Sequence, residues 1–213
     1  MIEQDKLDNF KKLGITLDMV NKSGQLIDKD KPHLGGNQPR IMKSSYVPNS
    51  WQYILDNYDI KSVLDIGGGF GFCTRWFLDK GIDCTLVDGL EYNVTNGVAS
   101  ENGFVHDLEE GPIKHEEVDL VVCIEVVEHI KEQYLQNLLD SLALGKYVLM
   151  THAFPGQGGW HHVNCQPTKY WTDHMSDYGY KVIEESQQKI RTIAQQEGGT
   201  HIHRSGLFLG RSL

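Results

Sequence analysis

A glycine-rich segment between an apolar run and a helical pattern is the most informative feature of this sequence. Four of five consecutive residues are glycine within "VLDIGGGFGFCTRWF" (63–77). Because glycine costs conformational entropy and offers the core no side chain, the loop must bring bare backbone close to a ligand. Gly67, Gly69 and Gly71 give the spacing G-x-G-x-G, and Phe72 stands where a dinucleotide fingerprint has its third glycine. The Gly-Lys-Ser/Thr of a P-loop is also missing, so the loop is not expected to bind a pyrophosphate.

Three aspartates accompany this loop near the ends of three apolar runs. Asp65 directly precedes the glycines, where an anion repels phosphate and attracts an amine. Asp88 ends "TLVD", where its carboxylate can accept hydrogen bonds from both hydroxyls of a ribose. Asp107 ends "FVHD" and can accept from an exocyclic amine such as that of adenine. An amine, a ribose and an adenine without phosphate are the parts of S-adenosylmethionine, which we therefore expect as the cofactor.

Two carboxylates and an imidazole follow the fourth apolar run, in "CIEVVEHI" (123–130). If this segment is helical, Glu125, Glu128 and His129 share one face at positions i, i+3 and i+4. Oxygen and nitrogen ligands in this combination suit Mg²⁺ or another divalent metal. The segment is therefore a candidate metal site.

A third polar group lies in "THAFPGQGGWHHVNCQPTKYW" (151–171), a glycine-punctuated loop after the fifth apolar run. Polar side chains are interleaved there with aromatic ones, which suits a sugar or another polyhydroxylated acceptor. His152, His161 and His162 are candidates for a general base because imidazole titrates near neutral pH. Together with Glu128 they are our catalytic candidates. The alternative is that the histidines only tie the loop together by hydrogen bonds.

The elements that must position these residues alternate along the chain. After a helical pattern at 50–59, short runs rich in β-branched residues alternate with helical patterns, which predicts an α/β fold with an open, doubly wound parallel sheet. The predicted strands are 61–67, 83–89, 103–107, 118–125 and 146–153, and the predicted helices between them are 72–81 and 131–144.

The last part of the chain predicts one more helix, from residue 168, and two late strands at 180–186 and 201–211. Little room for a helix is expected between these strands, so we expect an antiparallel hairpin at the sheet edge. His201, His203 and Arg204 alternate along the second strand, a pattern more typical of a solvated strand face than of a site.

Length, charge and hydropathy set the class of protein. The 213 residues suffice for one α/β domain, which we place at 50–213, preceded by an irregular arm or lid at 1–49. A net charge of −9 argues against a nucleic-acid partner, which would call for a basic face. No apolar run approaches the roughly 18 residues of a membrane span, and the charged start resembles no export signal. We therefore expect a cytoplasmic protein without membrane contact, either a monomer or a homodimer.

In this order, the segments "VLDIGGGFG", "LVDG", "HDLEEGP" and "VDLVVCIEVVEHI" resemble the class I S-adenosylmethionine-dependent methyltransferases over roughly residues 50–213. The resemblance implies a Rossmann-like, doubly wound, mostly parallel seven-stranded sheet with an antiparallel last strand. It implies that Gly67, Gly69 and Gly71 let the backbone approach the cofactor. It also implies that Asp107 and the Leu108 amide hold the adenine.

The E-x-x-E-H segment is similar to the metal-binding motif of two methyltransferase families. One makes ubiquinone by O-methylation, and the other methylates the 2′-hydroxyl at the 3′ end of small RNAs with a further histidine, for which His162 is the candidate here. In many metal-independent relatives the acids instead cap the helix or contact the cofactor, which is the alternative role of Glu125. A longer stretch of the chain resembles an unassigned methyltransferase group of bacteria and their phages.

These observations predict an enzyme that transfers a methyl group from S-adenosylmethionine to a hydroxyl of a small-molecule or glycan acceptor. Two alternatives stay open. One is a metal-dependent RNA 2′-O-methyltransferase, which the acidic charge disfavours. The other is a catalytically inactive module that only binds S-adenosylmethionine, which the histidine-rich loop at 151–171 disfavours.

Overall fold

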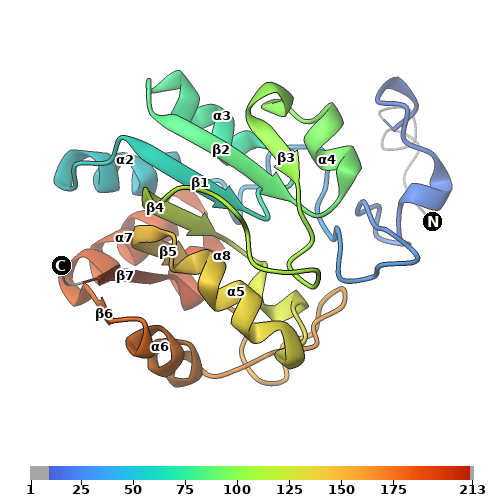
Figure 1. Ribbon diagram of the computed structural model, residues 1–213. Coiled ribbons are helices and arrows are strands. Elements are labelled where there is room, and N and C mark those ends of the chain that lie inside the picture. Colours follow the sequence, from blue (N-terminus) through green and yellow to red (C-terminus); the bar gives the residue numbers. More distant parts are fainter. Residues whose placement is uncertain (1–9, 212–213) are drawn as a thin grey trace.

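A seven-stranded sheet forms the centre of the computed structural model, which describes residues 10–211 (Figure 1). The strand order is β3-β2-β1-β4-β5-β7-β6; the first five are parallel, and β7 runs antiparallel to both its neighbours. The Rossmann-like sheet with an antiparallel last strand is thus confirmed. The strands are β1 Ser62–Ile66, β2 Asp83–Asp88, β3 Gly103–Val105, β4 Val118–Cys123, β5 Gly145–Met150, β6 Tyr180–Val182 and β7 Leu207–Arg211.

Helices cover both faces of the sheet, because the central strands are apolar on both sides. In β4, Val121 and Cys123 belong to the apolar cluster that contains α5 and α6, whereas Leu120 and Val122 belong to the cluster that contains α2, α3 and α7. The helices are α2 Pro48–Asn57, α3 Phe72–Asp79, α4 Glu91–Asn96, α5 Leu135–Leu142, α6 Thr168–Asp177, α7 Glu184–Glu197 and α8 Thr200–Ser205. Short 3₁₀ turns are η1 Leu17–Met19, η2 Ser100–Asn102, η3 Val127–His129 and η4 Glu132–Tyr134.

The region between the two late strands differs from the sequence prediction. β6 and β7 do pair antiparallel at the sheet edge, but the 14-residue helix α7 and the short helix α8 lie between them. The prediction of no helix there was wrong because α7 is largely polar, and only a few of its residues, such as Ile190 and Ala194, are buried apolar ones. His201, His203 and Arg204 consequently lie on α8 and not on a strand.

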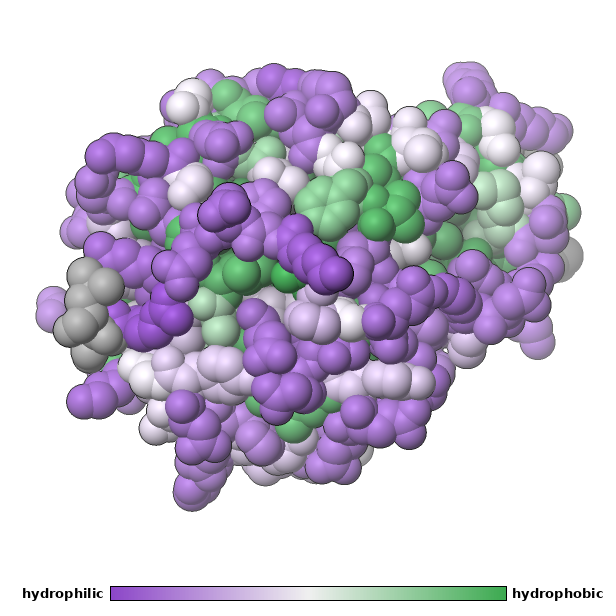
Figure 2. Space-filling view, viewed as in Figure 1, coloured by the Kyte–Doolittle hydropathy of each residue, from purple (hydrophilic) through white to green (hydrophobic). Residues whose placement is uncertain are grey.

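The described part of the arm, from residue 10 onward, packs against α4 and crosses the carboxyl edge of the sheet (Figure 1). Phe10, Leu26 and Leu34 are buried with Leu90, the residue before α4, in a small apolar cluster of their own. Figure 2 shows a mostly hydrophilic face with apolar side chains gathered in a few patches. Of the helices that the structure describes, none is both long enough and apolar enough to traverse a bilayer.

Candidate active site

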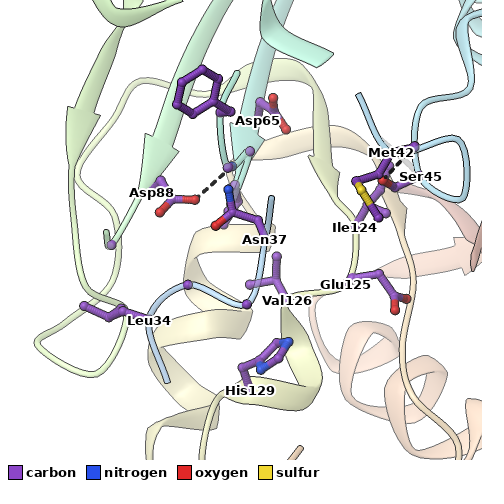
Figure 3. A pocket seen from close by; sticks show the side chains of 18 of the residues that line it. Leu34, Asn37, Met42, Ser45, Asp65, Asp88, Ile124, Glu125, Val126 and His129 are labelled. Atoms are coloured by element: carbon purple, nitrogen blue, oxygen red, sulfur yellow. Dashed lines mark hydrogen bonds between the residues drawn. The ribbon is translucent and has the colours of Figure 1, made fainter. Parts of the chain in front are cut away.

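A cavity of about 450 Å³ lies between the carboxyl edge of the sheet and the arm (Figure 3). It is open at the switch between β1 and β4, where the strand order reverses and ligands of open α/β sheets bind. Figure 3 shows Asp65 and Asp88 on one side of this space and Glu125 and His129 on another. The cavity wall is completed by arm residues 33–38, loop residues 157–160 and 162, and His201 of α8.

The glycine loop adopts the backbone that the sequence predicted. Gly67 and Gly69 have φ of 66° and 57°, in the left-handed region that favours glycine. A Cβ on Gly67 would lie 2.3 Å from a methyl carbon of Val126, so no larger residue fits without displacing the β4 exit. The Gly69 amide donates to Asp88 Oδ2 over 2.8 Å. The loop therefore presents bare backbone to the cavity.

Asp88, the predicted ribose partner, lines the cavity. Its buried carboxylate accepts hydrogen bonds from the amides of Gly69 and Leu90, both at 2.8 Å, and from Asn93 Nδ2 at 3.0 Å. Burial raises the pKa of Asp88 above its ordinary value, and these donors oppose the rise. The carboxylate is held rigidly at the cavity wall, where ribose hydroxyls can reach it.

Asp65 lies under the glycine loop and organises the start of α3. Its Oδ2 accepts from the Thr74 amide at 3.1 Å and from the Thr74 hydroxyl at 2.7 Å. Burial raises the pKa of Asp65 to about 6, and the Thr74 bonds oppose this rise. Asp65 lines the cavity, as expected for a group near the amino-acid end of the cofactor.

Asp107 lines the opposite end of the cavity and holds the arm. His33 Nε2 lies 2.9 and 3.0 Å from its two oxygens, Lys31 Nζ lies 3.0 Å from Oδ2, and the Glu109 amide donates over 2.9 Å. Burial acts to raise the pKa of Asp107, but these donors outweigh it and lower the pKa. Asp107, the predicted partner of the adenine, is therefore already bonded to two residues of the arm. Leu108 also lines the cavity.

Glu125 stands at the exit of β4 in a strained conformation, with φ of 57°. Its Oε1 accepts from the Thr151 hydroxyl at 3.0 Å, and its own amide donates to Thr151 Oγ1 at 2.8 Å. Its Oε2 pairs with Nδ1 of His201 at 2.8 Å. Burial acts to raise the pKa of Glu125, but the hydrogen bond and charge of His201 lower it below the ordinary value. His201 was assigned to a solvated strand face, and no local pattern in the sequence pointed to this pairing.

Of the four predicted metal ligands, Glu125, His129 and His162 line the cavity and Glu128 does not. The segment after β4 is the 3₁₀ turn η3, so the shared α-helical face of Glu125, Glu128 and His129 does not exist. Glu128 is fully buried, does not line the cavity, and both its carboxylate oxygens lack a hydrogen-bond partner. Burial and the charge of Glu125 raise the pKa of Glu128 to about 8, which keeps the group neutral. Across residues 10–211, no three His, Cys, Asp or Glu side chains are placed to hold a metal ion.

Only one of the three predicted catalytic histidines reaches the cavity. His162 lines it beside His129, with ring centroids 5.1 Å apart, and its Nδ1 lies 3.2 Å from the carbonyl oxygen of Gln157. His152 is buried, and its Nε2 forms a hydrogen bond of 3.0 Å with the Thr168 hydroxyl. This is the alternative role, in which a histidine only ties the loop together. His161, with its Nε2 buried, is not among the lining residues either. A histidine-rich loop at a strand end therefore did not predict which rings line the cavity.

Comparisons with known proteins relate the chain to methyltransferases. A protein family described as "Methyltransferase domain" matches residues 64–149, which run from β1 to β5. Ubiquinone biosynthesis O-methyltransferase of Rickettsia prowazekii is 30% identical over 106 residues, which cover 43% of this chain and 42% of that protein. The same-named protein of Rickettsia canadensis is 28% identical over 88 residues, covering 38% and 37%. The chain thus spans less than half the length of these relatives.

Solved structures show the same fold. Magnesium protoporphyrin IX methyltransferase from Synechocystis PCC 6803, crystallised with bound S-adenosylmethionine, has a TM-score of 0.53 at 15% identity and covers 77% of this chain and 76% of its own. A SAM-dependent methyltransferase from Archaeoglobus fulgidus has a TM-score of 0.52 at 17% identity, covering 76% and 91%. Residues 64–149 thus match a methyltransferase domain, and the chain shares the fold of a methyltransferase that was crystallised with S-adenosylmethionine.

Proposed function

We propose that this protein transfers the methyl group of S-adenosylmethionine to a hydroxyl of a small-molecule or glycan acceptor. The observation that carries the proposal is the wall of the cavity beyond the glycine loop, where His129, His162 and His201 lie together with Glu125. A hydroxyl acceptor must lose a proton during transfer, so its site needs a nearby proton acceptor. The O-methyltransferases among the relatives support the same type of reaction.

The size and charge of the site favour a small acceptor. The cavity of about 450 Å³ must hold the cofactor as well as the acceptor, and the arm covers part of it, which favours an acceptor of small size. Trp160 and Gln157 line the wall near His162, giving an aromatic face beside polar groups. The net charge of −9 disfavours a nucleic-acid acceptor, because a phosphate backbone binds to a basic surface.

We also propose that residues 1–49 act as a lid on the domain at 50–213. Several contacts join the described part of the arm to the walls of the site. Besides the bonds of Lys31 and His33 to Asp107, the side-chain amides of Asn37 and Asn93 exchange two hydrogen bonds of 3.0 Å. The Trp160 indole donates to the carbonyl of Pro32 over 3.0 Å. A cofactor enclosed in this way leaves only when these contacts open.

The lid predicts a change in the kinetics of cofactor release. Replacing His33 by alanine removes the buried bond to Asp107, so we expect S-adenosylhomocysteine to dissociate about tenfold faster, the effect of roughly 1.4 kcal/mol. Stopped-flow displacement of bound S-adenosylhomocysteine measures this rate. Lys22→Ala, an exposed change in the same arm, is the control and is expected to leave it unchanged. Equal rates for all three proteins would contradict the lid.

The reaction itself is tested with the purified protein, S-adenosylmethionine and a panel of phenols, catechols, sugars and RNA oligonucleotides. We expect S-adenosylhomocysteine to form with a small hydroxylated acceptor, and mass spectrometry to locate the new methyl group on oxygen. Excess EDTA is expected to leave the rate unchanged, because no three His, Cys, Asp or Glu side chains of residues 10–211 are placed to hold a metal ion. Turnover confined to RNA, with binding that weakens steeply in salt, would favour the RNA alternative. Cofactor binding without turnover on any acceptor would favour the inactive module.

A further inference from the structure

We propose that His201, oriented by Glu125, is the general base that takes the proton from the acceptor hydroxyl. The inference rests on the proposed O-methylation and names the residue that performs its proton transfer. It derives from the pairing of a helix residue near the end of the chain with the residue that follows β4.

The hydrogen bonds of the pair determine which ring nitrogen is free. Glu125 Oε2 lies 2.8 Å from His201 Nδ1, so the neutral ring keeps its hydrogen on Nδ1 and its lone pair on Nε2. Within residues 10–211, no side chain or backbone group forms a hydrogen bond with this Nε2. The ring lines the cavity, and about a third of its side chain is exposed. Nε2 is thus available to a hydroxyl in the cavity.

Contacts with neighbouring residues hold the Glu125–His201 pair in place. Of the described residues other than glycine, only Glu125 and His161 have a left-handed backbone, a conformation that costs on the order of 1 kcal/mol or more. Two hydrogen bonds with Thr151 hold Glu125 in this strained position. The His201 amide in turn donates to the carbonyl of Ser44 over 3.1 Å, which ties the start of α8 to the arm. Strain held by several contacts is common at catalytic residues.

The other imidazoles at this end of the cavity are less suited to the role. Burial lowers the pKa of His129 to about 4, and its Nδ1 is buried without a partner. The Nδ1 of His162 lies on a backbone carbonyl, which cannot stabilise an imidazolium as a carboxylate can. His33 does pair with a carboxylate, but at the Asp107 end, where we expect the adenine.

The proposed step balances in atoms and charge. The hydroxyl oxygen attacks the methyl carbon in line with the carbon–sulfur bond, which breaks and leaves its electron pair on sulfur. The hydroxyl proton passes to Nε2 of His201, and the resulting imidazolium is stabilised by the carboxylate of Glu125 before it releases the proton to water. The products are the methyl ether, S-adenosylhomocysteine and one proton.

The test compares His201→Ala and His201→Asn with wild type, using a hydroxyl acceptor found with the panel. Asparagine can still donate to Glu125 but cannot accept the proton, so both variants are expected to lose about 100-fold or more in kcat, in the range of general base catalysis. The dissociation constant for S-adenosylmethionine is expected to stay within about twofold of wild type. His203→Ala, on the same helix but outside the cavity wall, is the matched control and is expected to retain kcat.

Two readouts separate proton transfer from a structural role. Added imidazole is expected to restore activity to His201→Ala, and the loss is expected to shrink for acidic phenols, which need no base. Glu125→Gln is expected to lower kcat about tenfold with little change in KM. A kcat within threefold of wild type in both His201 variants, or an equal loss of kcat for acidic and weakly acidic acceptors, would overturn the role of His201. It would leave the proposed O-methylation standing. Methylation by wild type only at nitrogen, sulfur or carbon would instead overturn the proposed O-methylation and remove the need for the base.

Discussion

Replacing Asp88 by asparagine is expected to weaken S-adenosylmethionine binding about 100-fold. The carboxylate is fixed by the amides of Gly69 and Leu90 and by Asn93, and we propose that it accepts from the two ribose hydroxyls. Hydrogen bonds to a charged group contribute about 1.5–3 kcal/mol each. Losing the equivalent of one to two of them therefore raises the dissociation constant about 100-fold. Isothermal titration calorimetry measures the dissociation constant directly.

The control for this prediction lies on the same strand. Asp83→Asn removes a carboxylate from the exposed start of β2, at the end away from the cavity, and is expected to leave cofactor binding unchanged. Thermal melting of both variants without cofactor shows whether the fold is preserved. A dissociation constant within threefold of wild type in folded Asp88→Asn would mean that the ribose binds elsewhere.

Glu128→Gln is expected to flatten the decline in stability with rising pH. The pKa of Glu128 is raised to about 8 in the folded protein, chiefly by burial, above an ordinary value of 4.5. Between these two values the folded state binds more protons than the unfolded state, so the free energy of unfolding falls as pH rises from about 4.5 to about 8 and is steady above. Glutamine has no such proton. We expect the variant to gain several degrees in Tm over wild type at pH 8, and much less at pH 5.

This prediction is measured by thermal melting at a series of pH values between 5 and 8. Glu116→Gln, which removes an exposed carboxylate, is the control and is expected to keep the pH dependence of wild type. Parallel curves for wild type and Glu128→Gln would show that the folded protein holds Glu128 ionised, as a bound cation would do. The measurement therefore also tests whether Glu128 is a metal ligand.

The sequence alone predicted the features that depend on short segments. Alternating apolar runs and helical patterns gave the positions of β1 to β5, because strand and helix periodicity are local properties. The glycine spacing predicted a loop of bare backbone, which lies at the cavity, since φ values such as those of Gly67 and Gly69 are accessible to few other residues. Asp88 followed from the same reasoning, because a strand end must lie at the ligand-binding edge of a parallel sheet.

Tertiary structure alone decided which side chains face one another in the cavity. The prediction for Glu128 assumed a helix, whereas the left-handed backbone of Glu125 and the turn η3 direct Glu128 into the core. His201 meets Glu125 only because α7 and α8 return the chain to the carboxyl end of β4. The bonds of His33 to Asp107 likewise join segments far apart in the sequence. Such contacts depend on how whole helices and strands pack together. The spacing of residues within one segment does not determine that packing.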